Sequence, residues 1–294
     1  CLDRWREGIY LLFEYKGLFF ALYSKACIVI KIAVLGDAHL IADRDSYKHL
    51  HVDRAFFKSG WSSIQNLLKK VNRESPDLTI FLGDLVDWFS PENIAFGLDL
   101  LSVLRKPWHM TPGNHDLAAP VDGPNQEAYK TAATRGHLPY WAEQGVDLTN
   151  RVLDIDGCQL ILLDSALSDL TDGADAWLDR ELKHFSTNLL FTHVPIDLPE
   201  IRAYILSVDP RRKMAKYVLS GAPNLYLEHV KARISHVFSA HLHFSGDLHR
   251  DTTRFHLCNM SIAMYDPHRD QSAVAAATII EYERDAFVFR KISG

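Results

Sequence analysis

The order of apolar and polar positions becomes regular at residue 31 and then alternates between two periods. Three short runs are wholly apolar and are bounded by turn or polar residues: residues 31–36 (KIAVLG), 77–83 (DLTIFLG) and 188–193 (NLLFTH). Runs of this kind predict buried central strands. Between the first two, five apolar residues recur at helical spacing before Pro76 stops the pattern: Trp61, Ile64, Leu67, Leu68 and Val71. A strand, a helix and a second strand are predicted in that order.

The same patterns predict the later elements and their layers. Ser90 as N-cap and Pro91 at the first helical position start a second helix, which leads to a strand around 108–111. Farther on, we predict two hairpins, a helix and a buried strand: residues 151–165 around Gly157, 275–292, 175–182 and 234–240. Strands alternate with helices early and pair as hairpins late. This order predicts an α/β fold, a four-layer α/β/β/α sandwich of two mixed sheets with flanking helices.

The first thirty residues have a different composition. Residues 8–30 are apolar and aromatic, but Glu14, Lys16 and Lys25 divide them into runs shorter than the roughly 18–20 residues that a membrane span needs. An export signal is disfavoured because acidic residues precede and divide the apolar run. We assign 1–30 to an N-terminal extension and 31–294 to a single domain. The extension is expected to pack on the domain, with contact to a membrane surface or a second copy as the alternative.

Composition restricts the class of protein. The chain has 294 residues, 47% of them hydrophobic, and a net charge of -5, which gives no basic face for a nucleic-acid polymer. Its four cysteines lack the short spacing of a thiolate zinc site or a disulfide framework. A reducing, cytoplasmic location is therefore expected, and a homodimer is left open.

Polar motifs stand where the predicted strands end. They are residues 36–39 (GDAH), 83–87 (GDLVD), 113–116 (GNHD), 192–193 (TH) and 241–243 (HLH). Sites in α/β sheets lie at strand ends, and a glycine lets the chain turn sharply there. Asp37 and His39 would share one face if extended, as would His241 and His243, which indicates two ions or one crowded ion. Imidazole together with carboxylate and amide oxygen suits Mn, Fe or Zn.

This series resembles the signature of calcineurin-like metallophosphoesterases over residues 31–260. The resemblance implies two divalent or mixed-valence transition-metal ions with seven ligands: Asp37, His39 and His243 on one, Asn114, His193 and His241 on the other, and Asp84 bridging. It also implies that a metal-bridging hydroxide attacks phosphorus while His115 acts as general acid. Asp116 would orient His115 or support the site from behind. Ala240 departs from the glycine usual in the last motif, and its methyl group is expected to alter the local geometry.

The substrate is less sharply predicted. Residues 160–165, 176–182 and 189–195 resemble the cyclic-nucleotide phosphodiesterase-like branch, which implies a small phosphodiester substrate, with a cyclic nucleotide as one candidate. The alternatives are a phosphomonoesterase, a nucleotide or pyrophosphate hydrolase, and a non-catalytic scaffold with this fold. Substrate selectivity is hypothesised to lie in residues 117–150.

Two smaller features carry alternatives. Asp87 is either a loop carboxylate or a hydrogen-bond partner of a liganding histidine. Arg211, Arg212 and Lys213 follow Asp209-Pro210, which we interpret as a helix start. These basic residues are either a solvated turn or a border of the cleft that attracts an anionic substrate.

Overall fold

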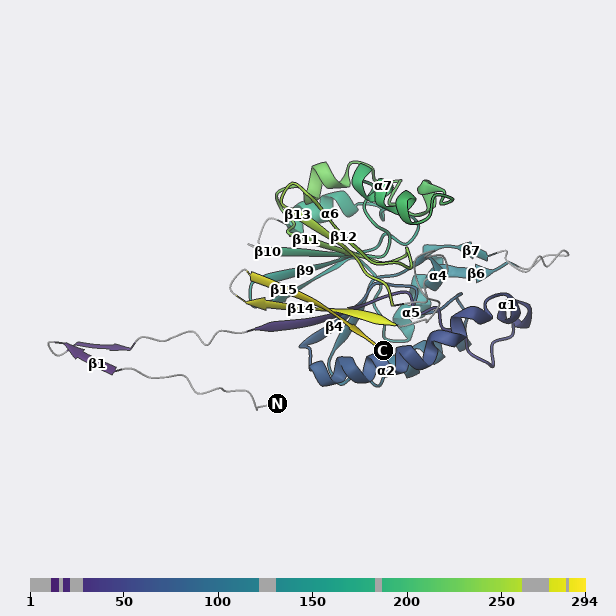
Figure 1. Ribbon diagram of the computed structural model, residues 1–294, viewed down its shortest axis with the longest axis horizontal. Helices are drawn as coiled ribbons and strands as arrows, with labels where there is room; N and C mark the ends of the chain where they lie inside the picture. Colours follow the sequence, from purple (N-terminus) through teal and green to yellow (C-terminus); the bar gives the residue numbers. More distant parts are fainter. Residues whose placement is uncertain are drawn as a thin grey trace.

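Two β-sheets lie face to face, and helices cover the outer face of each (Figure 1). The structure is a computed structural model that describes the following residues: 12–15, 18–21, 29–121, 131–182, 187–260, 275–283 and 286–294. This arrangement confirms the predicted four-layer α/β/β/α fold. Strands of both sheets end on the same side of the molecule. Side chains of the residues that follow these strands can therefore meet.

The five-stranded sheet has the order β15-β14-β3-β4-β5. Its parallel strands are the predicted ones: β3 (Ile30–Leu35), β4 (Leu78–Phe81) and β5 (Trp108–Met110). The C-terminal hairpin of β14 (Ala276–Glu283) and β15 (Ala286–Ser293) adds antiparallel to β3.

Two helices connect these parallel strands. α2 (Trp61–Glu74) buries the predicted stripe: Ile64, Leu67, Leu68 and Val71. α3 (Pro91–Leu101) begins at the predicted cap, where Ser90 Oγ accepts a hydrogen bond of 3.1 Å from the Asn93 N–H. The sequence patterns therefore located both helices.

The six-stranded sheet has the order β12-β13-β11-β10-β9-β8. Four strands are parallel: β9 (Cys158–Leu163), β10 (Thr187–Thr192), β11 (His236–Ser239) and β13 (Thr253–Leu257). Antiparallel strands close both edges: β8 (Arg151–Ile155) and β12 (Gly246–Arg250). The predicted hairpin around Gly157 is confirmed, with this glycine at φ 82°.

Two helices cover this second sheet, and one prediction about them is wrong. α6 (Ala174–Glu181) was expected, and α7 (Pro199–Val208) begins with Pro199 in its first turn. Asp209-Pro210 does not start a helix. A proline forces the residue before it toward extended backbone, and Asp209, at φ -139° and ψ 95°, ends α7 instead.

The remaining elements are short. They are β1 (Leu12–Tyr15), β2 (Leu18–Ala21), α1 (Lys48–Asp53), η1 (Ala55–Gly60), α4 (Asn114–Leu117), β6 (Ala118–Pro120), β7 (Thr131–Ala133), η2 (Arg135–His137), α5 (Leu138–Glu143), η3 (Met214–Lys216) and the π-helical turn η4 (Tyr226–Val230). The other residues of 1–28 lie outside the described part, so the packing of the extension and the division at residue 30 stay predictions. No helix in the described ranges is long and apolar enough to cross a membrane.

The core has a layer on each side of both sheets. Between the sheets, Ile32 and Val34 from β3 pack with Leu160, Phe191 and Phe238 from the facing strands, and all five are buried. Because β3, β4, β9 and β10 are covered on both faces, their sequences are mostly apolar and do not alternate strictly with polar residues. This two-sided packing fixes the strand ends that carry the polar motifs.

Candidate metal centre

The seven predicted ligands converge from the ends of five strands. Asp37 and His39 follow β3, Asp84 follows β4, and Asn114 follows β5; His193, His241 and His243 follow β10 and β11 of the other sheet. Their donor atoms form two groups within 4.8 Å that could hold a metal ion: Asp37, His39, Asp84 and His243, and Asp84, His193 and His241. Asn114 Oδ1 lies 3.3 Å from His193 Nε2, next to the second group. Asp84 belongs to both groups.

In each group two imidazole nitrogens face each other. His39 Nε2 lies 3.0 Å from His243 Nε2, and His193 Nε2 lies 3.1 Å from His241 Nδ1. Two nitrogen ligands bound to one ion at about 2.1 Å, at a right angle, are about 3 Å apart. Both spacings therefore fit a pair of ligands on a single metal ion.

Hydrogen bonds to carbonyl groups set the tautomers of two of these rings. His193 Nδ1 donates to Leu82 O at 2.7 Å, and His241 Nε2 donates to Lys216 O at 2.7 Å. A carbonyl oxygen only accepts, so in each neutral ring the proton is on the nitrogen that faces away from the group. The facing nitrogens then present lone pairs to each other, as metal ligation requires.

The Asp84 carboxylate lies between the two groups. Its Oδ1 accepts from the His115 N–H at 2.8 Å, whereas its buried Oδ2 accepts no hydrogen bond from any residue that the structure describes. This Oδ2 atom is 3.5 Å from His39 Nε2 and 3.3 Å from His193 Nε2. A buried carboxylate oxygen without a partner is costly, and a cation on each side would satisfy it.

The buried titratable groups of the site shift one another's pKa values. Burial raises the pKa of Asp37 to about 8, with the Asp84 charge adding to the effect and His193 opposing it. Burial also acts on Asp84, but the neighbouring His193 and His115 outweigh it and hold the pKa of Asp84 well below its usual range. For His193 burial lowers the pKa, yet Asp84 and Asp37 together raise it to about 9. The buried negative charge of these carboxylates is thus unfavourable, and a divalent cation beside them would offset it.

Five of the predicted ligand residues have left-handed backbone. Their φ values are 61° at Asp37, 47° at His39, 54° at Asp84, 69° at His241 and 59° at His243. The condition of extended chain is therefore not met at either pair; sharp turns bring these residues together. Residues other than glycine rarely adopt this conformation, and such strain is concentrated at functional sites.

The motif glycines allow close approach between strand ends. Gly83, at φ 88°, has the left-handed backbone expected of a turn. At Gly113 a Cβ atom would collide with the Asp84 carboxylate. At Gly36 a Cβ atom would lie 3.0 Å from the Ala240 Cβ atom. Ala240 fits without left-handed backbone because Gly36, opposite it, leaves room for the methyl group.

Asp87 holds both a predicted ligand and the predicted acid. Its Oδ1 lies 2.9 Å from His39 Nδ1, and its backbone oxygen accepts from His115 Nδ1 at 2.7 Å. Arg54 donates to both carboxylate oxygens at 2.6 Å. These contacts support the interpretation of Asp87 as a partner of a liganding histidine. Arg54 was missed because it lies 33 positions away with no motif around it.

Of the two roles expected of Asp116, support of the site from behind agrees with the structure, whereas orientation of His115 does not. The Asp116 carboxylate accepts from four backbone N–H groups: those of Gly113, Asp84, Leu85 and Val86, at 2.7–3.2 Å. It ties the loop after β4 to the loop after β5. Burial and the Asp84 charge raise the pKa of Asp116 to about 7, while these N–H groups lower it.

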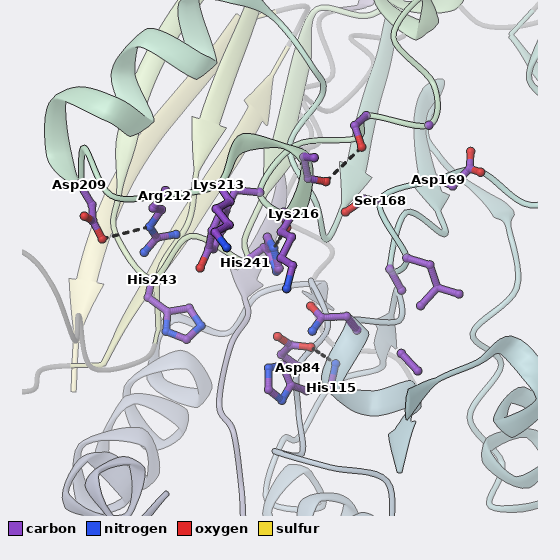
Figure 2. A pocket seen from close by; sticks show the side chains of 18 of the residues that line it. Asp84, His115, Ser168, Asp169, Asp209, Arg212, Lys213, Lys216, His241 and His243 are labelled. Carbon is purple, nitrogen blue, oxygen red and sulfur yellow. Dashed lines mark hydrogen bonds and ion pairs between the residues drawn. The ribbon is translucent and has the colours of Figure 1, made fainter. Parts of the chain in front are cut away.

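A cavity of about 1140 Å³ opens over both groups of ligands (Figure 2). Asp84, Asn114 and His115 line one side, and the segment after α7 lines another. Of the described part of residues 117–150, Ala133 lines the cavity, and the hypothesis on selectivity stays a prediction.

Several histidines outside the motifs pack against other rings. His236 and His256 stack at 5.3 Å beside Phe238, between the sheets, and His137 stacks on Phe89 at 3.9 Å. Cys158 and Cys258 are buried. His184, His268, Cys1 and Cys27 lie outside the described residues.

Known proteins resemble this chain in sequence and in fold. Residues 30–250 match the model of the calcineurin-like phosphoesterase family. A probable glycerophosphodiester phosphodiesterase from Arcobacter nitrofigilis is 27% identical over 137 residues, which are 45% of this chain and 48% of that protein. A probable cyclic nucleotide phosphodiesterase from Fibrobacter succinogenes is 26% identical over 171 residues, 57% of each chain. The match spans about half the length of these curated relatives.

The fold is also that of a solved structure. A dimetal phosphatase from Danio rerio superposes with a TM-score of 0.54, at 13% sequence identity, over 90% of this chain and 98% of that one. At this identity the likeness concerns the fold alone.

Proposed function

The chain belongs to the calcineurin-like phosphoesterase family, a family of metal-dependent hydrolases, and we propose that it hydrolyses phosphodiesters at a centre of two metal ions. The observation that carries the proposal is the position of Asp84. Its unbonded Oδ2 lies between two pairs of facing donor atoms, as a carboxylate shared by two ions would. The metal-binding residue types gathered at this site are stronger evidence for the function than the fold is, because one fold can have many functions.

The two groups of donors divide the seven ligands between two ions. One ion would be held by Asp37, His39 and His243, and the other by Asn114, His193 and His241; Asp84 would contact both. Nitrogen and oxygen donors without thiolate suit Mn, Fe or Zn. When bound, two such ions polarise the phosphoryl oxygens and lower the pKa of water, so that hydroxide forms near neutral pH.

We assign proton transfer to His115. The ring lines the cavity, and its Nδ1 donates to the Asp87 backbone oxygen at 2.7 Å. A neutral ring would therefore carry its proton on Nδ1, so the ring donates from Nε2 in its cationic form. His115 Nε2 would give this proton to the leaving alkoxide as the phosphorus–oxygen bond breaks.

Asp116 and Asp87 act as positioning residues in this scheme. Asp116 holds the backbone of Asp84 and Gly113 and thereby the bridging carboxylate. Asp87 keeps the His39 ring directed at the first group and the His115 ring directed into the cavity. Supporting partners of this kind affect metal affinity and activity by about 10–100-fold.

A diester is favoured over a monoester because the relatives that match in sequence are named phosphodiesterases. A phosphomonoesterase and a nucleotide or pyrophosphate hydrolase are the alternatives within the same chemistry. A non-catalytic scaffold is the alternative of another class, and the seven ligand types together with His115 speak against it.

Turnover and metal content should be measured separately. The protein is stripped with a chelator, reloaded with Mn²⁺, Fe²⁺ or Zn²⁺, and assayed with bis-p-nitrophenyl phosphate, p-nitrophenyl phosphate and a cyclic nucleotide. His115→Ala should lower kcat on the diester by about 100-fold or more and leave the metal content unchanged. His249→Ala, at an exposed histidine on β12, is the matched control. If none of the three substrates is hydrolysed with any of the metal ions, the protein is a non-catalytic scaffold.

A further inference from the structure

A basic segment, residues 211–217, lines the cavity across from Asp84 and His115 (Figure 2). It connects α7 to the rest of the outer layer and contains Arg211, Arg212, Lys213 and Lys216. In Figure 2 the side chains of Lys213 and Lys216 extend from this segment into the cavity.

Hydrogen bonds attach the basic segment to the loop that carries His241 and His243. Lys216 O accepts from His241 Nε2 at 2.7 Å, and Arg212 Nη2 donates to Leu242 O at 2.7 Å. The Arg212 guanidinium also lies over the Tyr217 ring at 4.4 Å. The segment therefore has a fixed position relative to two of the proposed metal ligands.

The four cations of the segment differ in their neighbours. Arg211 pairs with Asp209 at 3.1 Å, and its side chain is 72% exposed. Arg212 is only 9% exposed, lies 3.6 Å from the same carboxylate, and has a buried Nη1 without a hydrogen bond. Lys213 and Lys216 are exposed, and among the described residues no ion pair is formed by either ammonium group. Positive charge at this side of the cavity is thus only partly compensated.

We propose that Lys213 and Lys216, with the charge of Arg212 behind them, bind a second phosphate group of the substrate. This inference rests on the proposed function. A phosphodiester alone carries one negative charge, which the two metal ions and His115 would meet, so two further free ammonium groups indicate another anion. The cavity of about 1140 Å³ is larger than a single phosphoryl group needs. Ammonium groups bind phosphate through charge-assisted hydrogen bonds.

A pair of substrates that differ in one phosphate tests the proposal. Thymidine 5′-(p-nitrophenyl phosphate) is compared with the same compound carrying a 3′-phosphate, at fixed ionic strength. The Mn²⁺-loaded protein should show a higher kcat/KM for the compound with the 3′-phosphate. Lys213→Gln and Lys216→Gln should each lower the ratio of the two kcat/KM values about tenfold. Lys69→Gln, at an exposed lysine of α2 outside the cavity, removes the same charge and should leave the ratio unchanged.

A binding measurement separates this inference from the proposed function. Titration calorimetry gives the dissociation constants of thymidine 3′,5′-bisphosphate and thymidine 5′-phosphate for the wild-type protein and the lysine variants. A preference for the bisphosphate that falls in both lysine variants supports the subsite, even if no substrate is turned over. Hydrolysis with ratios that neither lysine variant changes overturns the subsite and leaves the proposed function intact. Binding ratios equal in the wild-type protein and in both lysine variants overturn the subsite as well.

Discussion

Gly36→Ala would press the ends of β3 and β11 apart. The new methyl carbon would lie 3.0 Å from the Ala240 Cβ atom and 3.1 Å from the Leu82 Cβ atom. Carbon atoms in good contact are about 3.5–4.0 Å apart, so both contacts are too short by roughly half an ångström or more. A methyl group cannot rotate away from such contacts, and the backbone must move. Overpacking of a dense core by one methyl group costs about 1–3 kcal/mol.

The same movement should weaken the metal centre. Gly36 precedes Asp37 and Ala240 precedes His241, and the Asp37 carboxylate accepts from the His241 N–H at 3.1 and 3.0 Å. Separating the two strand ends lengthens these contacts and moves ligands of both proposed ions. We expect the Mn²⁺ affinity of Gly36→Ala to fall about tenfold, as for other losses of support around a metal.

A double-mutant cycle tests whether the clash with Ala240 is the cause. Ala240→Gly removes a buried methyl group, about 0.8 kcal/mol, and adds backbone freedom of about 0.5–1 kcal/mol. Gly36→Ala/Ala240→Gly relieves one of the two short contacts. The loss of unfolding free energy in the double variant should therefore be smaller than the sum of the losses in the two single variants, by about 1 kcal/mol or more.

Urea unfolding in the presence of a chelator provides the free energies. The control cycle pairs Gly36→Ala with Ala174→Gly, a buried alanine of α6 in the other outer layer, and should be additive within about 0.5 kcal/mol. Additivity in the Ala240 cycle would refute the reasoning, because it would show that the two methyl groups do not compete for one space.

Two further predictions concern charge around the metals. Asp87→Asn removes the charge that pairs with Arg54 and supports His39, and should lower Mn²⁺ affinity about 10–100-fold in a competition titration; unchanged affinity would contradict the proposed support. Asp37, with a pKa of about 8, and His193, with a pKa of about 9, hold their protons more tightly in the folded state. Such groups stabilise the folded state below their unfolded pKa values and lose this effect as pH rises through the folded ones. In the presence of a chelator, the urea concentration at the midpoint of unfolding should therefore fall as pH rises from about 6.5 to 9, and added Mn²⁺ should suppress this fall. A midpoint that rises over this pH range contradicts the raised pKa values of Asp37 and His193.

The residues that sequence analysis found share a local signature. Each lies directly after a segment predicted to be a strand. An apolar run predicts a buried strand, and neighbouring parallel strands end at the same edge of their sheet. Asp84 and His193 could therefore each be placed at a strand end without any knowledge of distances. The hairpin around Gly157 was equally local, because a glycine between two alternating runs predicts a turn.

What sequence analysis missed depends on contacts between distant segments. Arg54 lies between two short helices in a polar stretch, and only the folded chain brings it to Asp87. Asp116 was expected to contact its sequence neighbour His115. Its carboxylate instead accepts hydrogen bonds from backbone N–H groups of the loop after β4. The left-handed turns at Asp37 and His39 were also not predicted, although aspartate and histidine adopt this conformation more often than most other residues.

The attachment of the basic segment to His241 makes metal and anion binding reciprocal. Lys216 contributes its carbonyl oxygen to a proposed metal ligand and its ammonium group to the cavity, so one residue responds to both occupants. Thermodynamic linkage requires that, if a bound metal ion improves the affinity for an anion at Lys216 by some factor, the anion improves the affinity for the metal ion by the same factor. Loss of the metal ions would then also weaken substrate binding, and bound substrate would slow the dissociation of the metal ions.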